Sequence, residues 1–118
     1  MADATRMSES QIEEALAGVP EWSEMSAGTS GEIQRTFQFA TFRDAIAFVH
    51  QVADYAEQAQ HHPNILIRYS KVTLSVNTHD AGGITAKDFE LAHACDKLFT
   101  AFPPATPKTS GVKAPRKK

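Results

Sequence analysis

Two neighbouring histidines are the residues of this sequence best suited to chemistry. His61 and His62 stand in the stretch EQAQHHPN, residues 57–64, directly before Pro63. Imidazoles titrate near neutral pH, so they can give or take a proton during a reaction. Glu57 lies four residues before His61, and on a helix these two side chains share one face, so we expect Glu57 to hold His61. The stretch predicts a proton-transfer site, although a solvated helix end with two incidental histidines has the same sequence signature.

The proline after the two histidines predicts where they diverge. A residue before proline is pushed out of the α region, so we expect Pro63 to end the helix. His62 would then turn towards a substrate while His61 keeps its place on the helix. Both rings would lie at a helix C-terminus, where the partial negative charge favours the cationic form of histidine.

A second group of polar side chains lies further along the chain. His79 is expected to end a strand and to continue its polar face, which predicts a floor for a polar ligand. Asp88 follows in the first turn of the next helix and could enter the same site. A simpler interpretation of Asp88 is structural, because an acid three residues after Thr85 is typical of a capping box.

Other kinds of site find less support in the sequence. His61 and His62 lack the i,i+4 spacing that lets two helical histidines bind one metal ion, and no Cys-x-x-Cys motif accompanies them. Gly82 and Gly83 precede a helix but lack the lysine of a phosphate-binding loop. The single cysteine, Cys95, is expected to be a buried, inert thiol. We therefore expect neither a metal ion nor a cofactor.

The elements that must position these residues follow from apolar periodicity. Helices are predicted over residues 8–17, over 42–61 and from 85 to about 102, and two β-hairpins are predicted, turning near residues 27–31 and 70–71. The resulting order is α-β-β-α-β-β-α. A four-stranded antiparallel sheet with the helices packed on one face, an α+β fold, would bury every apolar stripe. In the long middle helix the expected buried stripe is Phe42, Ile46, Val49, Ala53 and Ala56.

Length and composition indicate one ordinary domain. The chain has 118 residues, of which 42% are hydrophobic and 22% charged. We expect a flexible N-terminus over residues 1–8, a folded domain over 9–102 and a disordered basic tail over 103–118. The tail holds five basic residues and no acid, which leaves the rest of the chain acidic and disfavours nucleic acid as a partner, except weakly through the tail. Neither a membrane span nor a secretory signal is apparent, so a cytoplasmic location is expected.

Several of these features together resemble one known family. Glu57-x-x-x-His61-His62-Pro63, then Tyr69-x-x-Val72, Thr78-His79-Asp80, Gly83-Ile84-Thr85 and Lys87-Asp88 are the motifs that carry the likeness. Over roughly residues 9–100 the sequence resembles the pterin-4a-carbinolamine dehydratases. The resemblance implies the same α-β-β-α-β-β-α order, assembled as a homodimer or homotetramer.

The resemblance also implies an activity and a set of site residues. Members of the family are lyases that dehydrate 4a-hydroxytetrahydropterin to quinonoid dihydropterin, which recycles tetrahydropterin for aromatic amino acid hydroxylases. By this likeness His61 and His79 are the acid and base groups, and His62 orients or polarises the substrate. Glu57 and Asp88 would orient the histidine rings, with Asn77 and Thr78 as pterin contacts. Some relatives are instead binding proteins, either transcriptional coactivators or Rubisco assembly factors, so a non-catalytic role on the same scaffold is the alternative.

Overall fold

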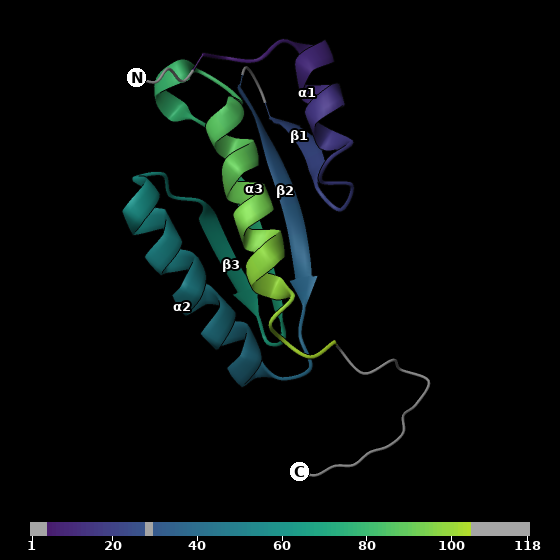
Figure 1. Ribbon diagram of the computed structural model, residues 1–118, viewed down its shortest axis with the longest axis vertical. Helices are drawn as coiled ribbons and strands as arrows, with labels where there is room; N and C mark the ends of the chain where they lie inside the picture. Colours follow the sequence, from purple (N-terminus) through teal and green to yellow (C-terminus); the bar gives the residue numbers. More distant parts are fainter. Residues whose placement is uncertain (1–4, 28–29, 105–118) are drawn as a thin grey trace.

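The fold is a single antiparallel sheet with helices against it (Figure 1). The computed structural model describes residues 5–27 and 30–104. Its elements follow in the order α1 (Glu9–Leu16), β1 (Ser23–Ala27), β2 (Ser30–Gln38), α2 (Phe42–Ala59), β3 (Asn64–Arg68), β4 (Lys71–Val76), the 3₁₀ helix η1 (His79–Ala81) and α3 (Ala86–Phe99). The predicted α+β fold and its order of helices and strands are confirmed. Residues 1–4 of the predicted flexible N-terminus and 105–118 of the predicted tail lie outside the described residues.

The sheet places two strands in its centre and two at its edges. The strand order is β1-β2-β4-β3, and each neighbouring pair is antiparallel. Side chains alternate along the central strands, so that on β4 Val72, Leu74 and Val76 are buried while the residues between them are partly exposed. Helices α2 and α3 lie side by side over the buried face (Figure 1). The core thus lies between this face and the two helices.

Aromatic rings fill much of that core. Phe37 on β2 and Phe39 just after this strand pack against Phe48 of α2, with ring centroids 4.8 and 5.0 Å apart respectively. Phe99, at the end of α3, packs edge-on against Phe39 at 5.1 Å. These contacts join the sheet to both long helices.

The buried face of α2 differs from the predicted stripe. The helix is present, but its buried residues are Ala45, Phe48, Val52 and Ala56. Phe42 and Ile46 are exposed, with 48% and 40% of their surface accessible. Helix α2 carries two apolar stripes with the same spacing, and periodicity alone does not say which one faces the sheet. Among the predicted stripe residues, only Ala56 belongs to the fully buried set.

The end of α2 is also earlier than predicted. The helix ends at Ala59, and Gln60 adopts a left-handed conformation with φ of 56°. The N–H groups of Gln60 and His61 both donate to the carbonyl of Ala56, and the bond from His61 is the longer-range bond found in a Schellman ending. Pro63 therefore lies beyond the turn that terminates the helix. The prediction that Pro63 ends it beside the histidines was wrong, because Gln60 reverses the chain first.

The segment between β4 and α3 is a short, closed loop. Strand β4 ends at Val76, and Thr78 forms an isolated antiparallel bridge with Gly83, whose carbonyl accepts from the Thr78 N–H at 2.8 Å. His79 lies inside this loop, at the start of η1, and not at the end of the strand as predicted. Thr78 and the start of α3 are thereby brought close together.

The described residues contain no helix long and apolar enough to cross a membrane.

Candidate active site

The centre of the candidate site is a close contact between His61 and Asp88. The ring Nε2 of His61 lies 2.6 Å from Oδ1 of Asp88. The Asp88 side chain is wholly buried and that of His61 is 10% exposed. His61 comes from the turn after α2 and Asp88 from the first turn of α3, so the tertiary packing of the two helices brings together residues that are 27 positions apart.

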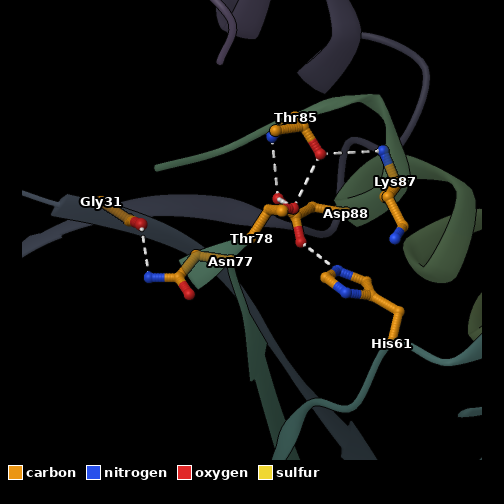
Figure 2. Close-up of polar contacts among 7 residues, drawn as sticks. All are labelled: Gly31, His61, Asn77, Thr78, Thr85, Lys87 and Asp88. Atoms are coloured by element: carbon orange, nitrogen blue, oxygen red, sulfur yellow. Dashed lines mark hydrogen bonds and ion pairs between the residues drawn. The ribbon is translucent and has the colours of Figure 1, made fainter. Parts of the chain in front are cut away.

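The other oxygen of Asp88 accepts hydrogen bonds from two residues that precede α3 in the chain. Oδ2 accepts from the hydroxyl of Thr78 at 2.9 Å and from the backbone N–H of Thr85 at 2.8 Å (Figure 2). Thr85 is the N-cap of α3, and Asp88 completes its capping box. One oxygen of Asp88 therefore caps the helix and the other contacts His61, so the structural interpretation is confirmed and a functional role of Asp88 stays a prediction.

These contacts decide which nitrogen of His61 can exchange protons. A carboxylate accepts hydrogen bonds and does not donate them, so Nε2 of His61 carries the hydrogen that points at Oδ1. The Nδ1 atom is then the nitrogen that is free to take up a proton from a ligand or, in the cationic ring, to deliver one. The arrangement of a carboxylate behind an imidazole is suited to general acid and base catalysis.

The second histidine has a different partner from the one predicted. His62 Nε2 lies 2.6 Å from Oε2 of Glu57, and both side chains are exposed, by 59% and 76%. We expected Glu57 to hold His61 at i,i+4 on a continuous helix. That pairing was wrong, because the left-handed turn at Gln60 carries His61 off the helix and leaves His62 beside Glu57.

The third histidine, His79, is the sequence neighbour of a residue in this network. His79 is exposed and follows Thr78, the residue whose hydroxyl reaches Asp88. Its carbonyl accepts from the N–H of Gly82 at 3.0 Å, which closes η1 and fixes the backbone at this point. The loop therefore fixes the backbone of His79 one residue from Thr78, whose hydroxyl contacts Asp88, while no hydrogen bond or ion pair joins the His79 side chain to His61 among the described residues.

The two predicted pterin contacts have distinct surroundings. The Asn77 side-chain nitrogen donates to the carbonyl of Gly31 on β2 at 3.2 Å, and in Figure 2 Asn77 lies to one side of the His61–Asp88 contact. Thr78 is only 6% exposed, and its hydroxyl is engaged with Asp88 and with Thr85. Contact of Asn77 with a ligand stays a prediction, whereas little of Thr78 is left to touch one.

Thr85 is the residue of the network that sequence reasoning did not include. Its hydroxyl lies 2.7 Å from that of Thr78 and accepts from the N–H of Lys87 at 3.2 Å. The capping-box spacing identified Thr85 as a helix cap, but its contact with Thr78 depends on the fold of the loop between them. Among the residues for which the structure gives positions, no group of three or more histidine, cysteine, aspartate or glutamate side chains could hold a metal ion.

Comparison with protein families points to one family over most of the chain. Residues 5–98 match the family described as pterin 4 alpha carbinolamine dehydratase. A protein of Roseiflexus sp. (strain RS-1) that carries the provisional name pterin-4-alpha-carbinolamine dehydratase is 52% identical over 96 residues, which are 81% of this chain and 99% of that protein. The match therefore spans nearly the whole of this relative.

Solved structures agree in fold. The crystal structure of a protein from Brucella melitensis, described as a transcriptional coactivator/pterin dehydratase, superimposes with a TM-score of 0.74 at 33% identity and covers 80% of this chain and 98% of that one. A pterin dehydratase-like protein described as a RuBisCO assembly factor in the alpha-carboxysome shares the fold, with a TM-score of 0.57, 21% identity and coverage of 67% and 89%.

Proposed function

We propose that this chain, which belongs to the pterin 4 alpha carbinolamine dehydratase family, dehydrates 4a-hydroxytetrahydropterin to quinonoid dihydropterin and water. The C4a–O bond of the substrate breaks and the hydroxyl leaves as water after taking up a proton. The N5–H bond gives up its proton, and its electron pair forms the C4a=N5 double bond. One proton is delivered and one removed, so acid and base groups suffice for the reaction.

We assign the proton transfers to His61 and His79. The Nδ1 atom of His61 faces away from Asp88 and would serve one of the two transfers, while the exposed ring of His79 would serve the other. His62, held by Glu57, would orient or polarise the pterin ring. Asn77 would contact the pterin through its side-chain oxygen, since its nitrogen is engaged with Gly31.

The observation that carries this proposal is the contact between His61 and the wholly buried carboxylate of Asp88. A buried carboxylate is costly unless it is hydrogen-bonded, and here both of its oxygens have partners. The carboxylate would hold the imidazole in one orientation and keep a hydrogen on Nε2. A fixed orientation and a defined tautomer are properties that an acid and base group requires.

A dehydration assay tests the proposal. Purified wild type is compared with His61→Ala, His62→Ala and His79→Ala in the conversion of 4a-hydroxytetrahydropterin, after subtraction of the uncatalysed rate. We expect losses of about 100-fold or more in kcat/KM for His61→Ala and His79→Ala, and a smaller loss for His62→Ala. An inactive but folded wild type would overturn the proposed activity, and full activity of all three variants would overturn the assignment of the site.

A second candidate function is a non-catalytic role in binding or assembly on the same scaffold, such as that of a coactivator or of a Rubisco assembly factor. Large apolar side chains exposed on the described surface favour a protein partner: Phe42, Ile46, Ile65, Leu66, Ile67 and Tyr69. The dehydration assay separates the two candidates, because a purely binding protein would not accelerate the reaction.

We further propose that the protein acts in the cytoplasm as a homodimer or homotetramer and serves an aromatic amino acid hydroxylase. The support for self-association is that β3 is an edge strand whose residues are all exposed. Sedimentation equilibrium measures the mass directly. A monomer of 12.9 kDa at micromolar concentration would exclude the assembly.

A further inference from the structure

Behind Asp88 lies a chain of hydrogen bonds that the proposed reaction does not itself require. It runs from the backbone N–H of Lys87 to the hydroxyl of Thr85 at 3.2 Å, from there to the hydroxyl of Thr78 at 2.7 Å, and on to Oδ2 of Asp88 at 2.9 Å (Figure 2). Thr78 and Thr85 are both buried, the latter completely.

The number of hydrogens available gives this chain one direction. Each threonine hydroxyl has a single hydrogen to donate. Thr78 donates its hydrogen to Asp88, so towards Thr85 it can only accept, and Thr85 must donate to it. The hydroxyl of Thr85 in turn accepts a hydrogen bond from the backbone N–H of Lys87, which can only donate. All the bonds therefore point towards the carboxylate.

The same direction continues on the other side of Asp88. With Oδ2 filled by Thr78 and by the N–H of Thr85, the carboxylate is fixed in rotation, and its Oδ1 is aimed at Nε2 of His61. Hydrogen bonds in series polarise one another, which strengthens the bonds that end on a charged group. A freely rotating carboxylate would offer His61 no such fixed acceptor.

We propose that the hydroxyls of Thr78 and Thr85 are positioning groups for His61: acting through Asp88, they keep the hydrogen of the neutral ring on Nε2 and leave Nδ1 for the substrate. This assigns Thr78 to the positioning of the base and replaces its predicted role as a pterin contact. The expected effect of these hydroxyls on kcat rests on the proposed dehydratase function. The predicted tautomer of His61 does not rest on it.

The most direct test is nitrogen-15 NMR of the histidine rings in the full-length wild type at a pH where His61 is neutral. We expect the resonances of His61 to show a protonated Nε2 and an unprotonated Nδ1. A ring that carries its proton on Nδ1 would overturn the proposal, and this result needs neither a variant nor any dehydratase activity.

Variants then test the two hydroxyls. Thr78→Val and Thr85→Val keep the shape of the side chain and remove the donor, and we expect each to lower kcat about 10-fold with little change in KM, and to mix the two tautomers of His61. Thr78→Ser and Thr85→Ser restore the hydroxyl and are expected to regain most of the wild-type kcat. Unchanged kcat and an unchanged His61 tautomer in the valine variants would contradict the proposal.

A matched control comes from another pair of threonines. Thr36 and Thr73 also share a hydroxyl contact of 2.8 Å, across β2 and β4, but on the exposed face of the sheet. Thr36→Val removes a hydroxyl of the same kind outside the Asp88 network. We expect it to leave the pH profile of kcat and the His61 resonances as in the wild type, and an effect as large as that of Thr78→Val would overturn the assignment to the network.

Discussion

Two neighbouring histidines in this protein make the same contact in opposite surroundings. His61 and His62 each place Nε2 at 2.6 Å from a carboxylate oxygen. The partner of His61 is Asp88, which is wholly buried, whereas the partner of His62 is Glu57, which is 76% exposed. The difference arises because Gln60 turns the chain and sends the first ring inwards and the second outwards.

Distance alone does not determine how much a contact contributes to stability. Water screens the exposed pair and solvates either group when the pair opens, so such pairs typically contribute less than about 1 kcal/mol. In the interior neither group has water as an alternative, and removal of one partner leaves the other unsatisfied at a cost of several kcal/mol. We therefore expect the His61–Asp88 contact to govern both stability and chemistry.

The largest expected effect comes from removal of the buried carboxylate. Asp88→Ala leaves His61, Thr78 and the N–H of Thr85 without their acceptor, and we expect the free energy of unfolding to fall by about 3 kcal/mol. Urea denaturation followed by circular dichroism measures it. A loss below about 1 kcal/mol would show that water replaces the carboxylate and that the site is not sealed.

Asp96 is a carboxylate of intermediate burial. Asp96 is 27% exposed, and its Oδ1 accepts from Nε1 of Trp22 and from Nη1 of Arg35, both at 2.8 Å. We expect Asp96→Ala to cost about 2 kcal/mol, between the values for Asp88 and Glu57. Urea denaturation under the same conditions ranks the three, and a different order would show that burial does not decide the value of these contacts.

The thiol of Cys95 extends the comparison to pH. Burial is the main cause that raises its pKa from 9.0 to about 12. The folded state thus keeps a proton that the unfolded state loses above pH 9, so the associated stability is present below that pH and is lost as the pH rises. Between pH 7 and pH 10 we expect the wild type to lose about 1.4 kcal/mol more than Cys95→Ala. Equal losses in denaturation at the two pH values would contradict the raised pKa.

The smallest effect is expected at the exposed pair. Glu57→Ala removes a carboxylate that water surrounds, and we expect the free energy of unfolding to change by no more than about 0.5 kcal/mol. The change should shrink further in 1 M salt, because salt screens exposed charges. A loss as large as that of Asp88→Ala would remove the distinction between the two histidines.

Local sequence signals predicted the elements of the fold well. The capping box at Thr85 begins α3 where predicted, because the bonds that make it lie within four residues of one another. The alternation of apolar and polar residues on β4 likewise predicted its buried face. The order of helices and strands followed from these signals alone.

The failures concern information that is not local. Phe42 and Ile46 have the same spacing as the residues of α2 that are buried, and only the packing against the sheet selects between the two stripes. The left-handed residue that ends α2 is Gln60, whereas glycine is the usual sequence signal for such an ending. The sequence therefore predicts a helix that continues to residue 61 and pairs His61 with Glu57 instead of Asp88. The hydrogen bond between Thr78 and Thr85 was not predicted either, because it depends on how the loop after β4 closes.

One measurement tests most directly the claim that the buried His61–Asp88 contact, and not the exposed His62–Glu57 contact, supports the proton transfer by His61. The dehydration of 4a-hydroxytetrahydropterin is followed with Asp88→Asn and Glu57→Gln in parallel, each of which keeps the size of the side chain and removes its charge. We expect kcat/KM to fall by about 100-fold for Asp88→Asn and by less than about 3-fold for Glu57→Gln. Equal losses, or a larger loss for Glu57→Gln, would contradict the account.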